Sequence, residues 1–139
     1  MALDLTSLKK AISSLEQAIK VSKSLAGKSL IEHEEEVICS GVIQNFEFTF
    51  ELCWKFMKRW LSENHSSDAI DGLSMKELFR ASAERQLIDN VESWFDYHRK
   101  RNRTSHTYDQ EAATEVFSAA CAFLPDAKDF LKRLEAKND

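Results

Sequence analysis

The run HRKRNRTSHTYD, from His98 to Asp109, brings cationic, imidazole and phenol side chains together in a short stretch. It contains Arg99, Lys100, Arg101 and Arg103, although the formal net charge of the chain is -4. A basic segment in an acidic protein predicts a local anionic partner, and phosphate suits arginine geometry well. The run is therefore the main candidate functional site, with His98 and Arg103 as candidates for contacts with a substrate or nucleotide.

The side chains in the middle of this run are suited to cleavage of RNA without a metal. Arg101 can grip a phosphate with its forked guanidinium, and a neutral His106, with a pKa near ~6.5, can take a proton from a ribose 2′-hydroxyl. Asn102 can orient either group, and Tyr108 adds a phenol close to the histidine. One histidine cannot easily be both base and acid, so a two-fold dimer would complete the site.

The spacing of Arg101 and His106 constrains the local structure. Five residues at about 100° each place the two side chains roughly 140° apart on a continuous α-helix, so the helix must end between them. The segment 104–109 is a poor helix former and is rich in capping residues. We expect the helix to end near Thr104 or Ser105. The side chains that would then line one pocket are Arg101, Asn102, His106 and Tyr108.

Simpler explanations of these residues stay open. Basic side chains at the end of a helix offset its dipole, and His106 would then only cap a carbonyl group. Glu47 and Glu51 lie one turn apart on an otherwise apolar face of a predicted helix. Pairing of Glu51 with Lys55 is the ordinary interpretation, and a polar wall for the same pocket is the functional one.

The sequence has no pattern typical of a metal or nucleotide triphosphate site. It lacks a glycine-rich phosphate loop, zinc-spaced Cys and His pairs and a serine nucleophile elbow. His33, followed by residues 34–36, is better explained as part of a solvated helix start than as a metal ligand. We therefore expect no cofactor and no metal. If the protein takes part in nucleotidyl transfer, another chain must supply the catalytic carboxylates.

The composition predicts one all-α domain covering residues 1–139. Three glycines and one proline leave few turns, which favours long helices over sheets, and the length fits a single core. Three widely separated cysteines in apolar stretches suit a reducing compartment, and we expect the cytoplasm. No segment approaches the ~20 apolar residues that span a bilayer, so we expect no membrane association.

Apolar periodicity and capping residues locate the helices. The predicted helices cover about 5–25, 31–63, 75–84, 90–104 and 107–134, and a loop covers 66–72. Gly27 is the expected stop of the first helix, and Ser74 opens a capping box. Asp89 or Asn90 is expected to cap the fourth helix. The second helix has an apolar arc so wide that it must face two helices or another subunit.

The last helix has two possible starts and an interruption. Thr107, with Gln110 completing a capping box, and Asp109 are the alternative caps. Pro125 lies inside the helical pattern and is expected to kink or split the helix, because it lacks an N–H group and crowds the preceding turn.

Two segments resemble a known family. Residues 101–108, RNRTSHTY, resemble the motif of HEPN domains, an Arg, four residues, a His, any residue and a Tyr, in the branch that includes HepT toxins. Residues 41–55, GVIQNFEFTFELCWK, resemble the second-helix signature of the small bacterial nucleotidyltransferase substrate-binding proteins of that superfamily. The similarity covers nearly the whole chain, and the two segments occur in the right order.

This resemblance implies an up-and-down antiparallel four-helix bundle with an extra short helix, which forms a homodimer. Its implied partner is a separately encoded minimal nucleotidyltransferase. In the toxin–antitoxin branch, the residues matching Arg101 and His106 are assigned to ribonuclease activity, and in some members the partner adenylylates the tyrosine matching Tyr108. In another branch, the helical protein binds a nucleotide or substrate and presents it to the nucleotidyltransferase. The resemblance therefore implies a metal-independent RNase or, alternatively, a non-catalytic binding subunit.

Overall fold

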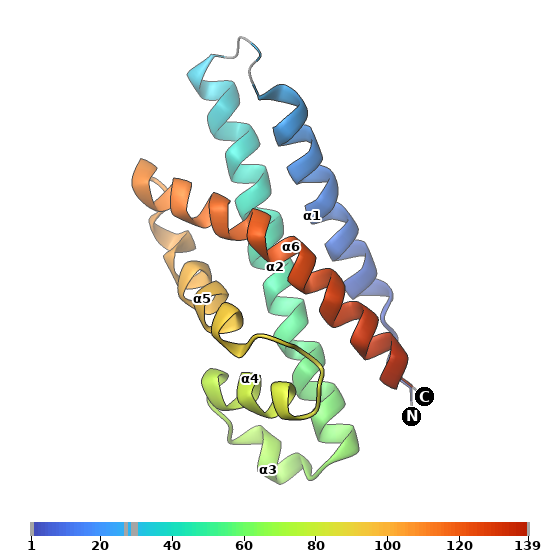
Figure 1. Cartoon of the computed structure of the whole chain (residues 1–139). Coiled ribbons are helices and arrows are strands. Elements are labelled where there is room, and N and C mark those ends of the chain that lie inside the picture. Colours follow the sequence, from blue (N-terminus) through green and yellow to red (C-terminus); the bar gives the residue numbers. More distant parts are fainter. Residues whose placement is uncertain (1, 27, 29–30, 139) are drawn as a thin grey trace.

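The computed structural model describes residues 2–26, 28 and 31–138, and every regular element in these ranges is helical. The elements are α1 (Thr6–Leu25), α2 (Glu32–Asn64), α3 (Ser67–Asp71), α4 (Met75–Glu84), α5 (Val91–Asn102), the 3₁₀ helix η1 (Arg103–His106) and α6 (Gln110–Lys137). Figure 1 shows α1 and α2 as a long hairpin crossed by α6, with α5 beside α2 and the short α3 and α4 at the lower end. The predicted all-α bundle is confirmed, although the short helices α3 and α4 and the 3₁₀ helix η1 accompany it instead of one short helix.

Capping residues set the starts of the helices that lead to the candidate site. Ser74 Oγ accepts a hydrogen bond from the Glu77 N–H (3.2 Å), and the Glu77 carboxylate accepts one from the Ser74 N–H (3.0 Å). Asn90 and Asp109 each accept a bond from the amide two residues further on. These bonds satisfy amides that have no partner inside the helix. The predicted capping box is confirmed, and Asn90 and Asp109 are the caps among the alternatives.

The predicted loop at 66–72 is wrong in part, because it contains the short helix α3. Ile70 is the reason: its side chain is 7% exposed and anchors this turn to the core. Burial of one apolar side chain is enough to order a segment whose composition favours a loop. The expected stop at Gly27 lies outside the described residues.

Pro125 does not split the last helix, which runs without interruption from Gln110 to Lys137. Its ring is exposed, whereas Phe123 and Ala127 on either side are fully buried. Packing of both halves of α6 against the core outweighs the loss of one hydrogen bond at the proline.

Aromatic rings fill the core where α2, α4, α5 and α6 meet. Phe50 on α2 has its centroid 6.1 Å from that of Phe79, 6.3 Å from Trp94 and 6.0 Å from Phe123. These four side chains are at most 2% exposed, and most of their pairs are edge-to-face or tilted, as aromatic quadrupoles prefer. The cluster joins α5 to α2 and so positions the C-terminal end of α5.

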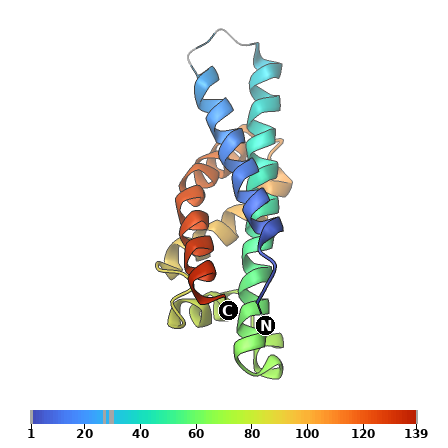
Figure 2. The same ribbon diagram turned by 90° about the vertical axis from the view of Figure 1, so that its right-hand side faces the viewer.

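The two ends of the described chain are held together by a reciprocal amide pair. The Leu3 N–H donates to Asn138 Oδ1 (2.8 Å), and Asn138 Nδ2 donates to the Leu3 carbonyl (2.9 Å). Figure 2 shows the N and C ends near each other, with α1 and α2 lying side by side as an antiparallel pair. Helices α1 and α6 are thereby tied together at one end of the bundle.

The three cysteines are free thiols that pack among apolar residues. Cys53 is fully buried, and Cys39 and Cys121 are half-buried. Burial raises the pKa of all three thiols, because the charged thiolate loses its hydration. None of the described helices combines the length and apolar character needed to cross a membrane.

Candidate functional site

Arg101, in the last turn of α5, is held by two carboxylates on α2. Its Nη1 lies 3.1 Å from Glu47 Oε2, and its Nε lies 3.2 Å from Glu51 Oε1. The Arg101 side chain is only 28% exposed, and Nε makes no hydrogen bond of good geometry despite the short distance to Glu51. The expected pairing of Glu51 with Lys55 is therefore wrong, because Glu51 faces Arg101 and Lys55 lies over the ring of Trp54.

Thr104 completes this arrangement, and the sequence reasoning missed it as a site residue. Its hydroxyl accepts from Arg101 Nη1 (3.1 Å) and lies within bonding distance of Glu47 Oε2 (2.8 Å). The same hydroxyl lies 2.8 Å from the Arg101 carbonyl, so it caps the end of α5. A threonine three residues after the arginine, where the helix was expected to end, was the available signal.

The guanidinium keeps part of its donor capacity. Nη1 and Nε face Glu47, Glu51 and Thr104, whereas within the described ranges the Nη2 amino group of Arg101 makes no hydrogen bond. Two carboxylates beside one guanidinium give the cluster a formal charge of −1. Arg101 is thus fixed in position, but its own surroundings do not attract an anion.

His106 lies beyond the point where the α-helix ends. Helix α5 stops at Asn102, earlier than the expected Thr104 or Ser105, and η1 then carries the chain to His106. A 3₁₀ helix has three residues per turn, so the side chains after Asn102 leave the α-helical spacing. The expected break between Arg101 and His106 is confirmed.

The imidazole of His106 is exposed and lies near a second exposed ring. The centroids of His106 and Tyr108 are 6.2 Å apart with the ring planes at 68°, and Tyr108 is 87% exposed. No side-chain hydrogen bond holds His106 within the described structure, so the expected alternative that it caps a carbonyl is not seen there. Asn102 is exposed as well.

A pocket of about 410 Å³ lies beneath Tyr108, between α2 and the start of α6. Its wall is made of carboxylate, hydroxyl and apolar groups, contributed by Glu35, Glu36, Cys39, Ser40, Ile43, Thr107, Tyr108, Gln110, Ala113 and Thr114. Of the four side chains expected to line one pocket, Tyr108 alone is in this wall. In the described part of a single chain, Arg101, Asn102 and His106 do not line this pocket. Convergence of all four side chains on one pocket stays a prediction.

The other cations of the basic run are also paired with carboxylates. Arg99 lies 3.1 Å from Asp96, and Arg103 Nε lies 3.2 Å from Glu115 Oε2. Lys100 lies 3.9 Å from both carboxylates. Arg99 and Lys100, together with Arg101, occupy the last turn of α5, which also suits the helix dipole. The run that looked like a free anion site in the sequence is largely neutralised in the fold.

We call Arg101 with Glu47, Glu51 and Thr104 the Arg101 group. His98 connects the Arg101 group to the aromatic core. Its ring stacks on Phe50, with the centroids 6.2 Å apart and the planes 18° apart, and it meets Phe79 edge-on at 6.3 Å. Burial lowers the pKa of His98, and the charges of Arg101 and Lys76 lower it further against the opposing effect of Glu51. The fold therefore disfavours protonation of His98, whose ring packs against the aromatic core.

The described residues offer no metal centre, since no three His, Cys, Asp or Glu side chains among them lie close enough together to bind an ion. The site consists of a fixed guanidinium, an exposed imidazole and phenol, and a pocket beneath the phenol. Such a set can bind a phosphate and move a proton.

A family model for "nucleotidyltransferase substrate binding protein like" matches residues 3–136. The chain belongs to this family. A curated relative, "probable ribonuclease HepT" of Haemophilus influenzae, is 36% identical over 105 residues, which are 75% of this chain and 72% of the relative. The protein is therefore a HepT-like member of the nucleotidyltransferase substrate-binding family.

Two solved structures share this fold. A Haemophilus influenzae protein, described as having the fold of a nucleotidyltransferase substrate-binding domain, superposes with a TM-score of 0.88 at 34% identity. The match covers 95% of this chain and 99% of that one. A protein from Thermus thermophilus superposes with a TM-score of 0.63 at 26% identity, over 86% of this chain and 98% of that one. The bundle built from α1, α2, α5 and α6 is thus the fold of the family.

Proposed function

We propose that this HepT-like protein is the helical subunit of a two-component toxin–antitoxin system and that it cleaves RNA without a metal. Its partner would be a separately encoded nucleotidyltransferase. The observation that carries the proposal is the helix end between Arg101 and His106, which leaves a fixed guanidinium on α5 and an exposed imidazole at the end of the following 3₁₀ helix. Membership of the family and the likeness to a probable ribonuclease support it.

The reaction is an in-line transfer within RNA. The ribose 2′-oxygen attacks the adjacent phosphorus, the bond from phosphorus to the 5′-oxygen breaks, and a 2′,3′-cyclic phosphate forms. His106 takes the proton of the 2′-hydroxyl, and a second imidazole gives a proton to the leaving 5′-oxygen. The free Nη2 edge of Arg101 bonds a phosphate oxygen as charge develops there, and Asn102 orients the phosphate.

The second imidazole would come from a second copy of the chain. Phe48 and Val37 on α2 are 60% and 58% exposed and lie eleven residues apart, which is about three helical turns, so they share one face. Phe48 directly follows Glu47, the partner of Arg101. A two-fold dimer through this face would cover exposed apolar surface next to each site.

Cleavage of a labelled RNA in the presence of EDTA tests this function. We expect the wild-type protein to produce fragments that end in a 2′,3′-cyclic phosphate, and His106→Ala to lose the activity while it stays folded, because the imidazole is exposed. His33→Ala removes another exposed histidine, on α2, and should keep the activity. Intact RNA with the wild-type protein, or equal cleavage by His106→Ala, would rule out the proposed reaction.

The pocket beneath Tyr108 favours a second candidate function, a binding subunit that presents a nucleotide or small substrate to the nucleotidyltransferase. Its volume of about 410 Å³ falls within the range of small-molecule sites. Titration calorimetry with ATP, in the absence and presence of the partner, separates the two functions. Saturable binding that Ser40→Leu abolishes, together with intact RNA, would favour the binding subunit.

A further inference from the structure

Two cations on α4 are not paired with any acid, in contrast to those of the basic run. Lys76 Nζ lies 5.7 Å and Arg80 Cζ 5.5 Å from the centroid of Phe95 on α5, so both cations lie over one ring. Both side chains are exposed. Among the described residues, no carboxylate lies within 4.0 Å of either of them. This part of the surface therefore carries positive charge that is available to a ligand.

The arrangement does not serve the stability of α4. Lys76 and Arg80 lie one helical turn apart, where like charges destabilise a helix. Glu77 lies between them in the sequence, but its carboxylate accepts a bond from the Ser74 N–H at the start of the helix. The ring of Phe95 holds both cations by cation–π contact without neutralising them.

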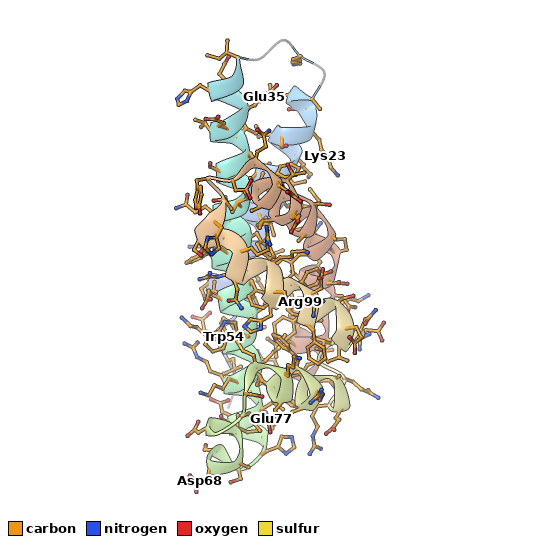
Figure 3. The ribbon with its side chains drawn as sticks, turned by 90° about the vertical axis from the view of Figure 1, so that its left-hand side faces the viewer. Lys23, Glu35, Trp54, Asp68, Glu77 and Arg99 are labelled. Atoms are coloured by element: carbon orange, nitrogen blue, oxygen red, sulfur yellow. The ribbon has the colours of Figure 1, made fainter. Side chains whose placement is uncertain are left out.

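These cations are linked to the Arg101 group through His98. Phe95, His98 and Arg101 follow one another at intervals of three residues over about 9 Å of helix, and each is offset by about 60° from the last, so they form a strip that winds around α5. The ring of His98 contacts Phe79 of α4, and the charges of Lys76 and Arg101 both act on His98. Figure 3 shows α4, which carries the labelled Glu77, directly below α5, which carries the labelled Arg99.

We propose that Lys76 and Arg80 bind the phosphodiester backbone of single-stranded RNA on its way to Arg101 and His106. This inference rests on the proposed RNase function and names the surface that holds the substrate. The Arg101 group has a formal charge of −1 and the other cations of the run are paired, so attraction for a polyanion must come from cations elsewhere. A flexible single strand can follow both α4 and the end of α5, and its phosphates release counterions at each cation.

Fluorescence anisotropy with a labelled single-stranded RNA in EDTA measures this binding without cleavage if His106→Ala is the background. Adding Lys76→Ala and Arg80→Ala should remove two phosphate contacts. The negative slope of the logarithm of the association constant against the logarithm of the salt concentration should then become smaller in magnitude by about 1.4. The affinity for RNA should fall roughly twentyfold at ~0.1 M salt. Lys76→Gln with Arg80→Gln keeps more of the packing over Phe95 and should give the same loss, which separates charge from folding.

The matched control is Lys20→Ala with Lys23→Ala, which also removes two exposed cations about one turn apart, on α1. In Figure 3 the labelled Lys23 and Glu77 lie near opposite ends of the molecule. The control should bind RNA like its parent. Equal losses in the two double variants, no loss in either, or a parent that binds no RNA would each overturn the inference. If the α4 variants alone lose binding and the wild-type protein cuts no RNA, the binding surface stands and the proposed reaction fails.

Discussion

Arg101 at the end of α5 and Glu47 in the middle of α2 form an ion pair of 3.1 Å, with the hydroxyl of Thr104 bonded between them. The pair joins the two segments that resemble the family motifs. Its side chains are 28% and 37% exposed, so water screens it only in part. This relationship fixes the guanidinium relative to the helix end.

Glu47→Gln should lower the free energy of unfolding by about 1–2 kcal/mol, because the change removes a charged partner of Arg101 and weakens the bond to Thr104. Urea unfolding followed by circular dichroism measures it. Glu135→Gln is the matched control, since Glu135 pairs with Lys9 at 3.3 Å but the two side chains are 45% and 55% exposed, and it should change stability by less than about 0.5 kcal/mol. Equal effects in the two variants would contradict the structural role of the Arg101 pair.

The pH dependence of stability should contain a contribution from His98. Its pKa in the folded state lies below the ordinary value of 6.5, first because of burial and then because of Arg101 and Lys76. The unfolded chain therefore binds more protons below pH 6.5, and the free energy of unfolding should fall as the pH drops from 6.5 to the lower folded-state value. Denaturant midpoints between pH 7.5 and 5 should fall less steeply for His98→Asn than for wild type. A variant at the exposed His33, His33→Asn, should keep the wild-type slope.

Phe50→Ala should destabilise the protein by about 3–5 kcal/mol, because Phe50 is fully buried at the centre of the aromatic cluster and contacts α4, α5 and α6. Phe50→Leu keeps most of the volume and should cost clearly less, below about 1.5 kcal/mol. Thermal unfolding gives both values. Similar losses for the two substitutions would argue against a cavity as the cause.

Phe48→Lys should convert the expected dimer to a monomer, because the charge would be buried in the interface next to Glu47. Light scattering coupled to gel filtration measures the mass directly. Val21→Lys alters another exposed apolar residue, which is 50% exposed on α1, and should leave the mass unchanged. A wild-type monomer, or a Phe48→Lys dimer, would contradict the proposed two-fold site.

Local residue chemistry was enough to predict the longer helices and several of their ends. The capping box at Ser74 and the bounds of α2 and α4 follow from near neighbours in the chain. The prediction failed at residues 66–72, where the short α3 depends on burial of Ile70. The split that it allowed at Pro125 is also absent, because the packing that keeps α6 continuous is tertiary.

The sequence by itself determined the all-helical class, the helix end between Arg101 and His106 and the family resemblance, because each depends on residue types at fixed short spacing. Only the tertiary structure decided the partners of the charged side chains. Glu51 faces Arg101 instead of Lys55, and Glu115 pairs with Arg103, because packing brings α2 and α6 alongside α5 and η1. Electrostatic interaction depends on distance in space, so cations without a nearby carboxylate, such as Lys76 and Arg80, could not be distinguished in the sequence from those that the fold neutralises.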